Sequence, residues 1–124
     1  MYTHKGTAAY RQISHSNLSG AEFEKAWFES VVMVLNRIKS GTIYSQVDAT
    51  IKLVEIVEGL GWISTNLNDA ISSQHRQLLK TIYSTCIQIL NATIETKNYE
   101  YLDIVISSMS AIVQKYEVPV NVTE

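Results

Sequence analysis

Hydrophobic residues recur every three or four positions along most of this chain, which is the period of an α-helix that buries one face. Polar and turn-forming residues interrupt this period three times. Four helical segments are therefore predicted, at about residues 19–40, 45–68, 73–95 and 98–116. The single proline, Pro119, follows the last segment, so no segment contains this helix breaker.

The residues at the ends of these segments fit helix termini. Ser19 and Glu22 have the spacing of a capping box, in which each side chain bonds the other residue's backbone amide. Gly41 suits the left-handed position after a helix, and Asn98 is a good N-cap for the last segment. Short connections make neighbouring helices antiparallel. We therefore predict an all-α fold: an antiparallel four-helix up-down bundle over residues 19–117. An extended or short-helical cap segment (1–18) precedes it, and a tail (118–124) follows.

The second helical segment differs from the others because it carries two apolar stripes. One stripe consists of Leu53, Ile56, Leu60, Ile63 and Leu67, and the other of Val47, Ile51, Val54 and Gly61. So wide an apolar surface predicts a helix that is contacted from two sides. Gly59 and Gly61 each cost about 1 kcal/mol relative to alanine in a helix. We expect them either to permit a close helix crossing or to mark a bend.

Composition and charge narrow the classes of function. The chain has 124 residues, which is enough for one domain with its own core. Its net charge is −2, so it lacks the positive charge that nucleic-acid binding needs. Its longest apolar run, Val31–Leu35, is far shorter than the roughly 20 residues that cross a bilayer. With no signal-peptide pattern and a single cysteine, we expect a cytosolic protein that does not insert into membranes.

The sequence shows no catalytic or metal-binding pattern. The three histidines lie far apart in the chain: His4, His15 and His75. No Glu-x-x-His occurs, although a metal site in a helical bundle normally uses this motif. Cys86 repeats with Ile82 and Leu90 on one face, which indicates a buried core residue rather than a nucleophile. We therefore expect neither enzymatic activity nor a cofactor.

The N-terminal segment holds apolar residues that belong to no helical stripe. They are Tyr2, Ala9, Tyr10 and Ile13. A tyrosine has an apolar body and a polar tip, which suits a half-buried interface. We predict that these four residues bind a partner and, in the free protein, fold back over a hydrophobic groove. Val47, Ile51, Val54 and Leu78 are the predicted groove residues, with burial in the core as the alternative.

The N-terminal motif resembles that of a known family. Met1-Tyr2, followed by Ala9-Tyr10 and Gln12, is similar to the signature of the flagellar export chaperone family FliS. In the first helix, the family's serine cap, apolar residue, aromatic residue and acid have counterparts in Ser19, Phe23, Phe28 and Glu29, while Gly20 and Ser30 replace its proline and glycine. Later positions match in kind at Ile82-Tyr83 and Leu90 and differ at Thr93, Ile94 and Tyr116.

The resemblance implies a binding protein rather than an enzyme, and no cofactor. Members of the family bind the disordered C-terminal segment of new flagellin in the cytosol, prevent premature polymerisation and keep it competent for flagellar type III secretion. Release at the export gate requires a further partner by the same resemblance. Ordering a disordered segment costs several kcal/mol, so a long hydrophobic groove must drive binding. The alternative is a helical adaptor or dimerisation module without an export role, and the chain is either a monomer or a homodimer.

Replacing Tyr10 tests the expected role of the N-terminal segment. Tyr10→Ala should alter the binding of a flagellin C-terminal peptide and leave the stability of the bundle nearly unchanged, because Tyr10 lies outside the helical stripes. Calorimetric titration and thermal unfolding measure the two effects. A large loss of thermal stability with unaltered binding would mean that the segment only straps the core.

Overall fold

A computed structural model describes residues 20–67 and 72–117, and these residues are helical apart from short connections. The elements are α2 (Gly20–Ser40), α3 (Gln46–Thr65), α4 (Ser73–Thr96), the 3-10 turn η2 (Tyr99–Tyr101) and α5 (Leu102–Glu117). The described part of the chain contains no strand, so the predicted all-α class and the four helices are confirmed. The predicted cap segment, 1–18, and the tail, 118–124, lie outside the described residues.

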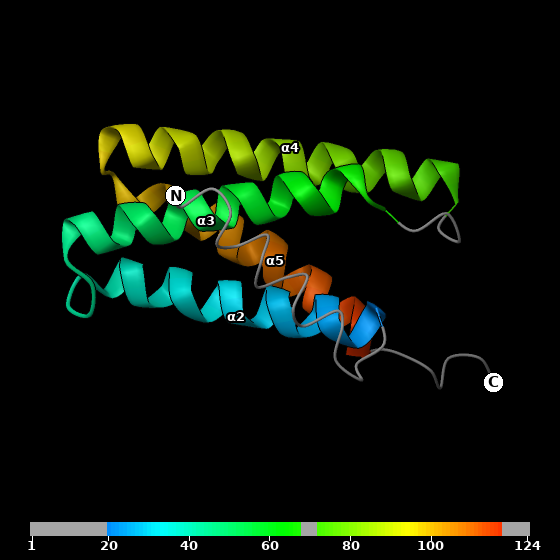
Figure 1. The fold of residues 1–124 in the computed structure, drawn as a ribbon, viewed down its shortest axis with the longest axis horizontal. Helices are drawn as coiled ribbons and strands as arrows, with labels where there is room; N and C mark the ends of the chain where they lie inside the picture. The colour runs from blue at the N-terminus through cyan, green and yellow to red at the C-terminus, as the bar shows by residue number, and fades with distance from the viewer. Residues whose placement is uncertain (1–19, 68–71, 118–124) are drawn as a thin grey trace.

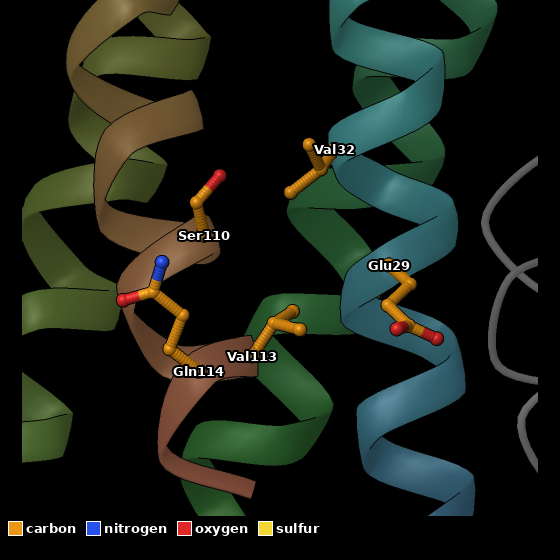
Figure 2. A pocket seen from close by; sticks show the side chains of 5 residues that line it. All are labelled: Glu29, Val32, Ser110, Val113 and Gln114. Carbon is orange, nitrogen blue, oxygen red and sulfur yellow. The ribbon is translucent and has the colours of Figure 1, made fainter. Parts of the chain in front are cut away.

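The helices pack mainly as two pairs. α2 packs along α5, and α3 packs along α4, while α4 and α5 also contact each other. Figure 1 shows α5 crossing obliquely from the end of α4 toward the start of α2. Between α2 and α5, Val32 and Val113 extend toward each other (Figure 2). They line a small hollow of about 280 Å³ with Glu29, Ser110 and Gln114. The arrangement is compatible with a helical bundle in which α5 closes the core against α2.

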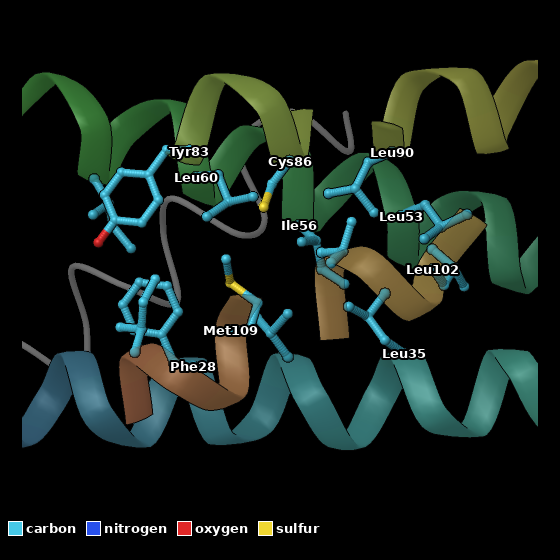
Figure 3. Close-up of a cluster of buried hydrophobic side chains, with 14 of the residues drawn as sticks. Phe28, Leu35, Leu53, Ile56, Leu60, Tyr83, Cys86, Leu90, Leu102 and Met109 are labelled. Carbon is cyan, nitrogen blue, oxygen red and sulfur yellow. The ribbon is translucent and has the colours of Figure 1, made fainter. Parts of the chain in front are cut away.

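One hydrophobic core lies between the helices, and each helix supplies one stripe to it (Figure 3). The first stripe predicted for the second helix is buried at Leu53, Ile56, Leu60 and Ile63. The fully buried side chains of the other helices include Phe23, Leu35, Ile38, Leu90, Leu102, Val105 and Met109. Phe28 and Tyr83 stack with their ring centroids 6.0 Å apart, which links α2 to α4 across the core. Burying each such side chain contributes about 1.5–3 kcal/mol.

Side-chain caps set where the helices begin and end. The Ser45 hydroxyl accepts from the Asp48 amide at 3.0 Å, and the Ser72 hydroxyl accepts from the His75 amide at 3.2 Å. Gly41 has a φ of 76° after α2, as the sequence predicts for this position. The predicted cap at Ser19 lies outside the described residues.

Two predicted helix ends need correction. The second helix ends at Thr65 and not near residue 68, because the Asn66 side chain donates to the Trp62 carbonyl at 2.8 Å and its backbone amide bonds Ile63. Asn98 does cap a helical segment, since its side chain accepts from the Glu100 amide. That segment is the 3-10 turn η2, and the α-helix proper begins at Leu102.

The two glycines of α3 have different surroundings. A Cβ built on Gly59 would lie 2.3 Å from Cζ2 of Trp27, whereas one on Gly61 would meet nothing within 4 Å. The Trp27 indole of α2 therefore lies directly against the α3 backbone. The Phe28 ring packs edge-on against the Trp27 ring, at an interplanar angle of 76° and with ring centroids 5.2 Å apart. Gly59 therefore permits the close approach of a side chain from α2 rather than of a whole helix, and nothing approaches Gly61 in this way.

Alanine substitutions at the two glycines should shift stability in opposite directions. Gly59→Ala should destabilise the fold by about 1–3 kcal/mol, because the new methyl group displaces the Trp27 ring. Gly61→Ala should stabilise it by up to about 1 kcal/mol through helix propensity. Urea unfolding followed by circular dichroism measures both changes.

A second background separates the steric effect from the propensity effect. In a Trp27→Leu protein the ring is gone, so Gly59→Ala should cost less than about 0.5 kcal/mol or become stabilising. An equal cost of Gly59→Ala in both backgrounds would show that the Trp27 contact does not explain it.

Candidate functional site

The largest apolar depression among the described hollows lies between α4 and α5. This first hollow has a volume of about 410 Å³, and its lining residues are His75, Leu78, Leu79, Ile82, Ser108, Ala111, Ile112 and Lys115. A second hollow between the same helices has a volume of about 220 Å³ and is lined by Gln88, Ile89, Ala92, Tyr101 and Ile104. The first hollow lies at the start of α4 and the second toward its end.

The two hollows lie along the same faces of α4 and α5. On α4, Leu78, Ile82, Ile89 and Ala92 are separated by four, seven and three positions, which places them on one face of the helix. On the other side, Tyr101 of η2 is followed at the same helical spacing by four residues of α5: Ile104, Ser108, Ala111 and Lys115. We call this surface the α4–α5 groove. From Leu78 to Ala92 it is about 21 Å long at 1.5 Å per residue.

α5 runs obliquely to α4. Near η2 the short connection keeps α5 beside the end of α4, and we call this the narrow end of the groove (Figure 1). Farther along, α5 diverges from α4 toward the start of α2, and we call this the wide end. The hollow at the wide end is accordingly almost twice as large, about 410 Å³ against about 220 Å³.

Three large apolar side chains protrude at the groove. Leu78 is 53% exposed, Ile104 is 57% exposed and Tyr101 is 42% exposed. Single exposed apolar residues are ordinary, but a contiguous apolar groove marks a surface that binds another molecule. The lining holds few polar groups, so the groove suits an apolar ligand surface rather than a small polar substrate.

The polar side chains in the core below the groove are buried and hydrogen-bonded. Cys86 is buried beneath it, and burial raises the pKa of its thiol, an effect that a hydrogen bond with Ser108 partly offsets. Thr93, also buried, donates its hydroxyl to the Ile89 carbonyl at 2.9 Å. Both polar core residues are therefore satisfied within the helices, as the sequence predicts for Cys86.

The structure does not bring the predicted groove residues together. Leu78 lies in the α4–α5 groove, whereas Val47 and Ile51 line a separate hollow of about 380 Å³ with Gln46, Thr50 and Lys97. Val54 is half-buried one turn farther along the same α3 stripe. The four predicted N-terminal contacts, Tyr2, Ala9, Tyr10 and Ile13, lie outside the described residues.

The second stripe of α3 faces away from the core. Val47 is 69% exposed, while Ile51 and Val54 are half-buried. Glu58 continues this stripe, and its Oε1 is buried without a hydrogen-bond partner among the described residues. A buried carboxylate oxygen normally accepts a hydrogen bond. The expectation that this helix is contacted from two sides therefore remains open at this stripe, and only the first stripe packs into the core.

Sequence reasoning missed the α5 side of the groove. Tyr101, Ile104 and Ala111 repeat at helical spacing beside the core stripe, so the last helix also has a wide apolar surface. This signal is present in the sequence. The core stripe of Leu102, Val105 and Met109 is sufficient to explain a helix that packs on one side, so it does not by itself call for a second apolar face.

Other kinds of site find no support in the described part of the chain. These residues hold no group of three or more side chains that could bind a metal ion. None of the described helices is long and apolar enough to span a bilayer. Comparisons with family models, curated proteins and solved structures found no match for this chain.

The burial of Cys86 predicts a protected thiol. In the native protein it should react with an aromatic disulfide reagent at pH 8 about 100-fold more slowly than in the unfolded chain, because reaction requires local opening and the raised pKa leaves little thiolate. The release of thionitrobenzoate measures the rate, with protein in guanidinium as the control. Rapid reaction in the native state would mean that the groove floor opens readily.

The raised pKa of Cys86 also makes the stability of the fold depend on pH. The folded state holds the thiol proton more tightly than the unfolded state. The stability contributed by this group is therefore present below the ordinary thiol pKa and declines as pH rises past it.

Proposed function

We propose that this protein is a cytosolic export chaperone for flagellin and that it binds flagellin's disordered C-terminal segment in the α4–α5 groove. The observation that carries the proposal is the apolar groove with protruding Leu78, Tyr101 and Ile104. The N-terminal motif Met1-Tyr2 with Ala9-Tyr10, which resembles that of the FliS family, supplies the identity of the partner.

The groove matches the physical demands of such a chaperone. A disordered segment that folds on binding must gain enough from apolar burial to offset its ordering cost. A groove about 21 Å long accommodates roughly four turns of an amphipathic helix. Covering the apolar side of that segment would block its assembly into filament and keep it competent for type III secretion. The proposed architecture around the groove is an antiparallel up-down bundle, and a further partner at the export gate would release the cargo.

The N-terminal segment fits the outer stripe of α3 in this proposal. Val47, Ile51 and Val54 offer an apolar surface outside the core, and the buried Glu58 Oε1 there needs a donor. The cap segment provides apolar side chains together with hydroxyl and amide donors, including Tyr10. We propose that residues 1–18 cover this stripe in the free protein and rearrange when flagellin binds.

A dimerisation or adaptor module is the second candidate. It is favoured by the exposure of Ile43, at 57%, close in sequence to the exposed Val47 at the start of α3. Two copies that bury these side chains against each other would form a homodimer without any export role. Sedimentation that shows a tight dimer, together with absent flagellin binding, would favour this function.

Two isoleucines of equal exposure test the proposed function. Ile104→Gln should weaken binding of the full-length protein to a flagellin C-terminal peptide about 5–10-fold, since roughly half of an isoleucine's surface is still available for burial. Ile43→Gln serves as the matched control, because Ile43 is equally exposed at 57% but does not line the groove. Calorimetric titration against flagellin from the same organism measures both affinities.

The pattern of results decides between the candidates. Weakening by Ile104→Gln alone supports the chaperone with its site in the groove. Flagellin binding that is weakened only by Ile43→Gln would contradict the proposed site, and absence of binding to flagellin by the unsubstituted protein would contradict the function.

A further inference from the structure

The α4–α5 groove carries opposite charges at its two ends. At the wide end, His75 and Lys115 line the first hollow. At the narrow end, the exposed Glu95 follows Ala92 by one helical turn on the same side of α4, so a carboxylate lies beside the second hollow. The groove is therefore basic at one end and acidic at the other, with apolar walls between them.

Three other charged residues on or near α4 and α5 lie away from the groove. Lys97 turns toward α3, where its Nζ donates to Thr50 at 3.3 Å and to the Ile94 carbonyl at 2.8 Å. Asp103 forms an ion pair with Lys39 of α2. Lys80 is exposed, but its position two residues after Leu78 places it on another face of α4. The polarity of the groove therefore comes from Lys115 at one end and from Glu95 at the other.

The helix dipoles do not cancel this polarity. The start of α4 and the end of α5 line the wide hollow, and the end of α4 and the start of α5 line the narrow one. At each end, a positive helix terminus therefore lies beside a negative one, and the two effects oppose each other. The charged side chains decide the local potential.

The apolar contacts also have a fixed spacing. Leu78 in the wide hollow and Ile89 in the narrow hollow are about eleven positions apart, which is about 16 Å along the helix. Ile82 also belongs to the wide hollow, and between it and Ile89 the α4 stripe carries Thr85, while the α5 stripe carries Ser108. A ligand helix that fills both hollows needs two apolar anchors about three turns apart, with small or polar residues between them.

We infer that the groove selects an amphipathic helix whose two ends are oppositely charged. The acidic end lies over Lys115, and the basic end lies over Glu95. This inference rests on the proposed function in that it names the chemistry of the segment bound at the same site. Charge complementarity at the rim mainly sets specificity and register, while the two apolar anchors supply most of the affinity.

Three designed peptides test the inference with the full-length protein. They share an eighteen-residue amphipathic design with leucine anchors eleven positions apart, and they differ only in their end charges (an acidic and a basic end, two acidic ends, or two basic ends). The peptide with one acidic and one basic end should bind about 5–10-fold more tightly than the other two at low salt. The difference should shrink toward nothing near 1 M salt. Fluorescence anisotropy of labelled peptides measures the affinities, and circular dichroism of the free peptides corrects for differences in helix content.

A single substitution should switch the preference. Lys115→Glu makes both ends of the groove acidic, so the peptide with two basic ends should become the tightest ligand. Lys80→Glu is the matched control, because it makes the same charge change on α4 away from the groove and should leave the ranking unchanged. Carbodiimide coupling followed by mass spectrometry should join the acidic end of the peptide to Lys115.

The outcomes distinguish this inference from the proposed function. Equal affinities for the three peptides, no binding of any of them, or a ranking that Lys115→Glu leaves unchanged would overturn the inference. Flagellin binding that Ile104→Gln weakens while Lys115→Glu does not would overturn it and leave the proposed function standing. If the protein selects the oppositely charged peptide but does not bind flagellin, the proposed function is contradicted and the inference stands.

Discussion

The packing of α5 against α2 is the constraint on which the rest of this structure depends. Leu102, Val105 and Met109 are completely buried, and this stripe draws α5 across the bundle toward the start of α2. A helix cannot lie flat against two neighbours that diverge. Because α5 follows α2, it diverges from α4, and the neighbouring stripe of Tyr101 and Ile104 stays exposed. The core and the groove thus have the same origin.

Local patterns in the sequence predicted the elements well. The 3-4 spacing of apolar residues located all four helices and the residues that each one buries, because burial of one face is a property of each helix alone. Capping residues marked several helix ends. The two ends that were predicted wrongly lie at Asn66 and Asn98, whose side chains form hydrogen bonds with the backbone that compete with the α-helical ones. Helix propensity could not distinguish Gly59 from Gly61, since only the position of Trp27 makes them different.

The candidate site was harder to predict because a groove is a relation between two helices. The sequence shows that α3 and α5 each have more apolar surface than one contact requires, but it does not show which neighbour covers the surplus. Val47 and Ile51 proved to lie beside Lys97, at the opposite end of α4 from Leu78. Only the crossing direction of α5 determines that Ile89 and Ile104 share a hollow. Two apolar surfaces outside the core suit a protein that exchanges one covering segment for another.

The pairing of α2 with α5 also sets an order of events during synthesis. α3 and α4 are neighbours in the chain and pair across a short connection, so their contacts form early. The ion pair between Lys39 and Asp103 joins residues 64 positions apart. α2 therefore gains its main partner only when α5 has been synthesised. Until then the side chains that α2 buries against α5 stay open to water, and the nascent chain is prone to aggregation.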